Sequence, residues 1–282
     1  MDITDNSADD IITIRLTKNQ AEIEASQRLR YKVFYEEQNA VPSAEMAALK
    51  MDFDEYDAVM DHLVVIDERL PKEDQIVGTY RLMRHEVAKK FGRFYSDAEF
   101  DIKPLLSTGT EIMELGRSCV LEPYRTRAIL QKLWGGIAHY VAEYKIGVMF
   151  GCGSLQGTNP AAMAEQLSYL YHYHLAPPAL RVRAVESRFV EMNIIPKEQL
   201  NVKQIFMSLP PLIKGYLRLG AGIGDGAIID HQWGSIDVCI VMPTHLVTDK
   251  YFKHYQRITN NAITIDDNFA GSVPAKKTVD AA

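Results

Sequence analysis

Short apolar runs of strand length are the feature of this sequence that most restricts its fold. They alternate with segments of helical apolar spacing, and none approaches the ~18 apolar residues that a membrane-spanning helix needs. The clearest strand candidates are IITIRLTK (11–18), DHLVVIDER (61–69), QIVGTYRLMRHE (75–86), TEIMELGRSCVLE (110–122), VMFGCGSLQG (148–157), RVRAVES (181–187) and IDVCIVMP (236–243). The clearest helical segments are 19–38, 128–147 and 159–174, the last with Pro160 in its first turn. The sequence therefore predicts a mixed α/β sheet with helices on both faces.

The chain has no internal linker, so we expect a single domain. Its 282 residues contain 47% hydrophobic residues, which is enough for a sizeable core. Only the ends lack periodicity. We expect a flexible tail over 1–10, a domain over 11–257 and a second flexible tail over 258–282.

Charge and cysteine content exclude several classes of protein. A net charge of −6 argues against a nucleic-acid-binding or polybasic membrane surface, so any basic site must be local. Three scattered cysteines favour buried free thiols over a disulfide framework or a zinc site. The acidic N-terminus does not have the order of a signal peptide. We therefore predict a cytoplasmic protein with at most peripheral membrane contact, no nucleic-acid partner and no metal.

Glu114 and Arg117 both lie just before the apolar run CysValLeu (119–121). Residues three apart on a regular strand point to opposite faces, but Gly116 between them makes a β-bulge plausible. A carboxylate at such a kink would be partly desolvated, which raises its pKa and suits a proton acceptor near neutral pH. A simple Glu114–Arg117 salt bridge is the alternative.

A second cluster of charges precedes the first buried strand. The segment MDFDEYDAVMDH (51–62) contains five acidic residues, among them Asp54 and Asp57. Arg81 interrupts an apolar strand and needs a partner, which Asp54 or Asp57 can supply, and Arg30 lies on the preceding helix. The carboxylates could hold a substrate ammonium group, or they could be fully occupied by Arg30 and Arg81.

A third, basic cluster is Arg125 and Arg127, which come just before a helix. The free amides and positive dipole end of a helix N-terminus favour a phosphate there.

Other motifs are ambiguous or misleading. His62 and Asp67 match an acyltransferase H-x-x-x-x-D pattern, but on a strand they face opposite sides. GAGIGDG (220–226) does not lead from a strand into a helix, so we interpret it as a flexible turn rather than a dinucleotide site. His172 and His174 end a helix with no further ligand beside them. Beyond the glycines, Asp230, Trp233 and Asp237 either close over a substrate pocket or simply hold the turn.

Taken in order, these motifs resemble a known family. LRYKVFYEE (29–37), DFDEYD (52–57), VGTYRLM (77–83) and MELGRSCV (113–120) are similar to the front half of the acyl-homoserine lactone synthases. The chain from about 10 to 257 more closely resembles the ornithine lipid synthesis N-acyltransferases, through ELGRSCVLEPYR, FGCGSLQGTNP and PPLIKGYLRLGA. The resemblance implies a GNAT-like, largely antiparallel sheet. It also implies transfer of a 3-hydroxy fatty acyl group from acyl carrier protein to the α-amino group of ornithine, which yields lyso-ornithine lipid.

The resemblance also assigns roles to residues. Glu114 and Arg117 would be catalytic, and Arg30, Asp54, Asp57 and Arg81 would bind substrate. Arg125 and Arg127 would meet the phosphopantetheine arm and the acidic carrier protein. RTRAIL lacks the glycine-rich phosphate loop, which favours a carrier-protein donor over coenzyme A, with no cofactor bound. Two alternatives stay open, namely an N-acyl amino acid synthase for another acceptor and a membrane-active, hemolysin-like binding protein.

Overall fold

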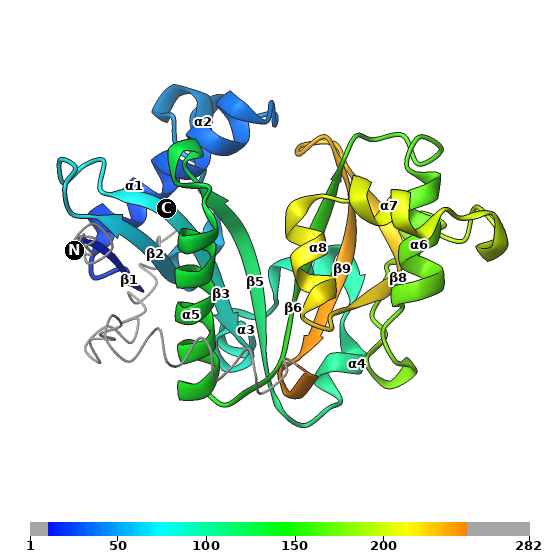
Figure 1. Ribbon diagram of the computed structural model, residues 1–282. Helices are drawn as coiled ribbons and strands as arrows, with labels where there is room; N and C mark the ends of the chain where they lie inside the picture. Colours follow the sequence, from blue (N-terminus) through cyan, green and yellow to red (C-terminus); the bar gives the residue numbers. More distant parts are fainter. Residues whose placement is uncertain (1–10, 247–282) are drawn as a thin grey trace, which may run out of the picture.

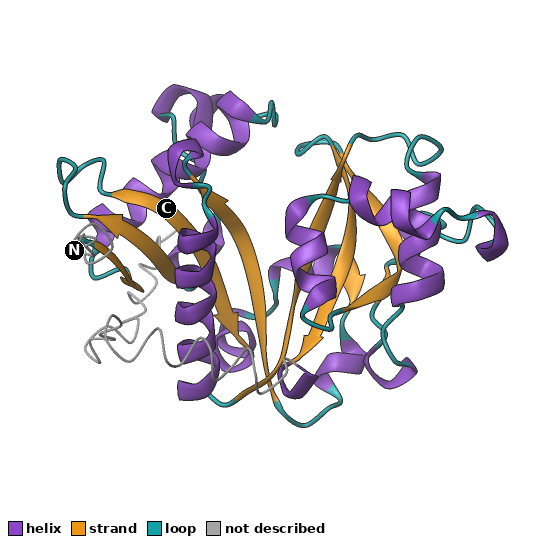
Figure 2. Cartoon of the chain, viewed as in Figure 1, coloured by secondary structure: helices purple, strands orange, loops and turns teal. Residues whose placement is uncertain are grey.

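The computed structural model describes residues 11–246, which form a nine-stranded mixed sheet with helices on both faces (Figures 1 and 2). The strand order is β1-β2-β3-β5-β6-β9-β8-β7-β4, with β5–β6 and β7–β8 parallel and the other pairs antiparallel. This confirms the predicted fold class. The proposed tails 1–10 and 258–282, and residues 247–257 of the predicted domain, lie outside the described residues.

Six of the strands, β1, β2, β3, β5, β6 and β9, match predicted apolar runs closely. The strand bounds are β1 Ile12–Leu16, β2 Asp61–Asp67, β3 Ile76–Arg84, β4 Phe100–Asp101, β5 Glu111–Val120, β6 Ile146–Gln156, β7 Arg183–Ala184, β8 Gly222–Asp230 and β9 Ser235–Pro243. The helices are α1 Gln20–Tyr31, α2 Ala44–Leu49, α3 His85–Phe91, α4 Lys103–Leu106, α5 Arg127–Glu143, α6 Ala164–His174, α7 Val202–Ser208 and α8 Pro211–Arg218. None of these helices, in the part of the chain that is described, is long and apolar enough to cross a membrane.

Alternation along β2 explains why helices cover both faces. Leu63 and Val65 join the core beneath α5, whereas Val64 and Ile66 point the other way and pack with the apolar face of α1. Because both faces of the central strands are covered, these strands read as nearly continuous apolar sequence.

Three local predictions differ from the structure. The glycine-rich segment from Gly222 is strand β8, not a flexible turn. Its glycines permit close packing, since a Cβ at Gly222 would lie 2.7 Å from the Ala176 Cα, and Gly226 takes φ +81° where the β8–β9 register shifts. Helix α6 begins at Ala164, so Pro160 lies in the turns before it rather than in its first turn. The predicted strand 181–187 is reduced to the two residues of β7.

Candidate active site

Strand β5 has a bulge just after Glu114. Thr79 pairs with Cys119 and Arg81 pairs with Gly116, so the single residue Tyr80 of β3 faces two residues of β5. The bulge confirms the predicted kink, although the residue in the left-handed region is Arg117, at φ 51°, rather than Gly116.

Beyond Glu114, β5 and β6 separate. Their ladder ends at the pair Glu114–Phe150, and the two strands diverge from there (Figure 1). At Gly151, just past the last pair, the β6 backbone still lies close to β5, because a Cβ at this position would lie 2.2 Å from the Leu115 carbonyl oxygen. A cavity of about 310 Å³ occupies the opening, and Glu114, Arg117 and Arg81 line it.

Glu114 is held on this wall by the 3-10 turn Tyr95–Ala98. The Tyr95 amide donates to Oε2 at 2.8 Å, the Ser96 amide donates to Oε1 at 2.8 Å, and the Ser96 hydroxyl donates to Oε1 as well. Burial raises the pKa of Glu114 to about 7, because it is only 2% exposed and these hydrogen bonds offset only part of the desolvation. Glu114 makes no ion pair with Arg117, so the salt-bridge alternative does not hold.

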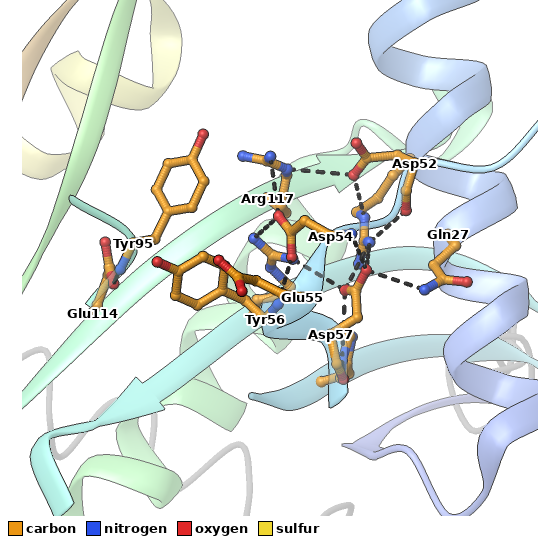
Figure 3. Close-up of polar contacts among 12 residues, drawn as sticks. Gln27, Asp52, Asp54, Glu55, Tyr56, Asp57, Tyr95, Glu114 and Arg117 are labelled. Carbon is orange, nitrogen blue, oxygen red and sulfur yellow. Dashed lines mark hydrogen bonds and ion pairs between the residues drawn. The ribbon is translucent and has the colours of Figure 1, made fainter. Parts of the chain in front are cut away.

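The acidic loop and the arginines form one buried ionic network (Figure 3). Arg30, with no exposed surface, donates to Asp52 at 2.7 Å and to Asp57 at 2.8 Å. Burial alone would raise the pKa of the Asp57 carboxyl, but Arg30 and Arg81 outweigh it and hold that pKa well below its usual range. Asp52, which the motif analysis did not select, is a central member of this network.

Arg81 and Arg117 complete the network beside the cavity. Arg81 donates to Asp54 at 2.6 Å and to Asp57 at 3.1 Å, as its position in an apolar strand required. Arg117 reaches Asp52 at 3.3 Å and Asp54 at 3.4 Å. Three arginines therefore meet three aspartates, and the carboxylates of Asp54 and Asp57 are occupied by protein cations.

The Arg117 guanidinium also lies between aromatic rings at the cavity. Its Cζ is 5.0 Å from the Tyr95 ring centroid and 4.5 Å from that of Trp233. Trp233 in turn packs edge-on against Phe34, and the Val41 amide donates to the Gln232 carbonyl oxygen at 2.8 Å. The β8–β9 turn is thereby joined to the opposite half of the molecule across the cavity.

Arg125 and Arg127 lie away from this cavity. Arg125 pairs with Glu37 and donates to the Val120 carbonyl oxygen at 2.9 Å, while exposed Arg127 is the first residue of α5. Helix α5 begins at the end where β5 and β6 diverge (Figure 1). The two arginines therefore flank that end of the sheet without lining the cavity.

The rejected motifs stay outside the site. His62 faces the Asp57 carbonyl oxygen, whereas Asp67 binds Arg69 and Tyr124, so the two do not act together. His172 contacts the Ile195 carbonyl oxygen and His174 the Tyr169 hydroxyl. Within residues 11–246, no group of His, Cys, Asp or Glu side chains is arranged to hold a metal ion.

Several residues that line the cavity were not predicted as site residues from the sequence. They are Tyr95, Ser96, Glu99, Cys152 and Ser154. They come from the polar segment before β4 and from β6, and only the folded sheet brings them to Glu114.

Comparison with known proteins identifies the family. The L-ornithine N(alpha)-acyltransferase of Agrobacterium fabrum is 44% identical over 245 residues, covering 86% of this chain and 84% of that protein. The enzyme of the same name from Brucella abortus is 43% identical over 256 residues, covering 89% and 91%. The chain belongs to the L-ornithine N(alpha)-acyltransferase family.

Two further comparisons found more distant similarities for this member of the L-ornithine N(alpha)-acyltransferase family. Residues 29–135 match the model of an acetyltransferase (GNAT) domain. A solved coenzyme A-dependent acyl-homoserine lactone synthase is similar at 11% identity and a TM-score of 0.48, covering 90% of this chain and 92% of that one.

Proposed function

We propose that this protein transfers a 3-hydroxy fatty acyl group from the phosphopantetheine arm of acyl carrier protein to the α-amino group of L-ornithine. The product would be lyso-ornithine lipid, in the first step of ornithine lipid synthesis. The observation that carries the proposal is the identity of 42–44% with four L-ornithine N(alpha)-acyltransferases over at least 83% of their lengths. We propose that the reaction takes place in the cytoplasm or at the inner face of the cell membrane.

Glu114 is the proposed general base. An α-ammonium group has no lone pair with which to attack, so a carboxylate must first accept its proton. Glu114 suits this role because it lines the cavity and burial raises its pKa to about 7. At that pKa it is substantially ionised at neutral pH and still basic enough to take a proton.

The freed amine then attacks the thioester carbonyl carbon. The C–N bond forms as the carbonyl becomes an oxyanion, and collapse of this intermediate breaks the C–S bond. The leaving thiolate takes one of the two protons that nitrogen loses, and Glu114 passes the other to solvent. Backbone amides of β5 beyond Glu114, which have no partner on β6, are suited to stabilise the oxyanion, an effect worth ~3 kcal/mol per donor.

The two faces of the sheet offer different surroundings to the two substrates. Glu114, Cys152 and Ser154 share the polar face of the opening, while Leu115, Ile240 and Tyr216 line its apolar side. We assign the amino acid to the polar side and the acyl chain to the apolar side.

The buried network of arginines and aspartates forms no open pocket for a substrate. It instead fixes the positions of the arginines that line the cavity. Of the four residues predicted to bind substrate, only Arg81 lines the cavity. Arg30, Asp54 and Asp57 belong to the ionic network next to Arg81 and do not line the cavity. We propose that Arg81 and Arg117 face the substrates and that their aspartate partners fix them. Arg125 and Arg127, at the open end of the sheet, are proposed to meet the carrier protein.

The direct test is acylation in vitro. The protein is incubated with 3-hydroxyacyl-acyl carrier protein and L-ornithine, and the products are analysed by mass spectrometry. Parallel reactions contain the coenzyme A thioester as donor, or glutamine or tyrosine as acceptor. We expect acylation of ornithine but not of glutamine or tyrosine. We also expect faster turnover with the acyl carrier protein thioester than with the coenzyme A thioester. Preferred acylation of glutamine or tyrosine would favour the alternative synthase, and no acylated amino acid at all would refute the proposal.

A further inference from the structure

A second group of carboxylates lines the cavity on the side away from the arginine network. It consists of Glu99, Asp230 and Asp237, which are 5%, 8% and 5% exposed. Glu99 comes from the segment before β4, Asp230 ends β8, and Asp237 lies on β9 opposite Ser154 of β6. The sequence offered two roles for Asp230 and Asp237, closing over a substrate pocket or holding the turn, whereas Glu99 belongs to none of its motifs.

The hydrogen bonds of this group leave it incompletely satisfied. Glu99 accepts from the Cys152 thiol at 3.2 Å and from Arg188 at 3.2 Å, and Asp237 Oδ1 accepts from the Ser235 hydroxyl at 2.8 Å. Asp230 Oδ1 accepts from the amides of the following turn. Asp230 Oδ2, however, has no hydrogen-bond partner among residues 11–246, although this buried side chain lines the cavity.

The charge of this group is also unbalanced. Arg188 is the one cation that pairs with it in the described chain, so three carboxylates face one guanidinium, in contrast to the three-to-three network across the cavity. Burial, together with repulsion between the carboxylates, raises the pKa of both Glu99 and Asp237. Buried carboxylates without enough cations are stabilised when a ligand supplies positive charge.

The separation of this group from Glu114 fits an amino acid with a short cationic side chain. Glu114 pairs with Phe150, and Asp237 pairs with Ser154, four residues further along β6. At ~3.3 Å per residue along β6 and ~4.8 Å for each step between neighbouring strands, the Glu114 and Asp237 backbones are about 16 Å apart. In extended ornithine the α and side-chain nitrogens are about 6 Å apart, and a hydrogen bond of ~3 Å at each end gives about 12 Å between the two carboxylates. The Glu114 and Asp237 side chains, which both line the cavity, cover the remaining distance.

We propose that Asp230 and Asp237, with Glu99 beside them, bind the side-chain ammonium group of the acceptor and so select a diamino acid. The inference rests on the proposed function and deepens it. It moves the cation-binding site from Asp54 and Asp57, whose carboxylates already bind arginines, to the opposite wall. The acceptor then lies with its α-amine at Glu114 and its second amine at Asp230 and Asp237.

The test compares ornithine with L-norvaline, which has a chain of similar length but no side-chain amine. We would measure kcat/KM for both acceptors in the full-length protein and in Asp230→Asn and Asp237→Asn. We expect each variant to lose about 10- to 100-fold in kcat/KM for ornithine, the range for a buried charged hydrogen bond, and to keep its rate with norvaline. In Asp230→Asn the amide oxygen can still accept from the turn, so the turn is retained.

Three comparisons make the result decisive. Asp225→Asn, on the same strand but paired with Arg183 outside the cavity, is the matched control and should change neither rate. Unchanged ornithine turnover in both asparagine variants, or equal losses with ornithine and norvaline, would overturn the inference while leaving the proposed function intact. If the unmodified protein acylates neither amino acid, the proposed function itself fails. Should Asp237→Asn not fold, Asp230→Asn alone decides.

Discussion

Replacing Glu114 by glutamine tests the central step of the mechanism. Glutamine keeps the shape and can still accept from the Tyr95 and Ser96 amides, but it cannot take a proton. We expect kcat/KM for ornithine to fall by about 10²- to 10⁴-fold, the usual contribution of a general base. The assay follows thiol release from the acyl carrier protein thioester and confirms the product by mass spectrometry.

The pH profile gives the more specific readout. If the ionised form of Glu114 is the base, as proposed, activity should rise with pH through its pKa of about 7. The ionised fraction grows about tenfold between pH 6 and pH 8, and kcat/KM should follow it. A carboxyl group at the ordinary value of 4.5 would give a flat profile over the same range.

Ser96→Ala provides a directional control. The Ser96 hydroxyl donates to Glu114 Oε1 and lowers the pKa of that carboxyl. Removing this donor should move the midpoint of the profile upward by about one pH unit, since a hydrogen bond to a charged group contributes ~1.5 kcal/mol. Nearly full activity in Glu114→Gln, or a flat profile for the unmodified protein, would refute the assignment of Glu114 as the base.

The same raised pKa predicts an effect on stability. Folded Glu114 binds its proton more tightly than the unfolded chain does, so its contribution to stability is greatest below pH 4.5 and is lost as pH rises through about 7. Relative to Glu114→Gln, the unmodified protein should lose about 3 kcal/mol of unfolding free energy between pH 4.5 and pH 8, measured by urea denaturation. A constant difference between the two proteins would show that this carboxyl group is not buried in its ionised form.

Two further substitutions test the walls of the cavity. Arg30→Met leaves buried carboxylates without their partner and should lower the unfolding free energy by about 3–5 kcal/mol, measured by urea denaturation, whereas Lys50→Met at an exposed ion pair should change it little. Equal effects would show that the network is not structural. Gly151→Ala places a Cβ 2.2 Å from the Leu115 carbonyl oxygen and should reduce both stability and kcat/KM, but Gly215→Ala in α8, with open space around it, should not. Wild-type activity in Gly151→Ala would contradict the importance of this close approach.

Much of the fold could be predicted because strand and helix periodicities are strong where both faces of the sheet are buried. Strand β8 was missed since its glycines look like a turn, and only the packed structure shows Ala176 and Phe189 taking the space of their side chains. Residue type alone would not indicate that Arg117 takes the left-handed position in the bulge. A non-glycine residue there costs ~1 kcal/mol, which the contacts of Arg117 with two carboxylates and two aromatic rings can offset.

The ionic network and the second group of carboxylates differ in how far sequence could reveal them. An arginine in an apolar strand, such as Arg81, indicates a buried acidic partner. Only one acidic loop lies nearby in the sequence, so few residues could be that partner. Asp230 and Asp237 flank one turn and could be named together as possible pocket residues, but Glu99 comes from a distant segment with no shared spacing. Their meeting depends on the β6–β9 register and on the position of the segment before β4, and neither can be obtained from local sequence patterns.

The bulge in β5 lets Glu114 and Arg117 both face the cavity without forming an ion pair. With one extra residue in the strand, Glu114 and Arg117 both face the cavity, and Tyr95 contacts each of them, through its amide and its ring respectively. A direct Glu114–Arg117 pair would lower the pKa of Glu114 and weaken it as a base. Because Asp52 and Asp54 bind Arg117, its charge is compensated elsewhere, and Glu114 can remain buried with a raised pKa a few residues away. In the proposed mechanism, the acidic loop would serve the reaction by occupying the arginines, which leaves the basicity of Glu114 available for the incoming ammonium group.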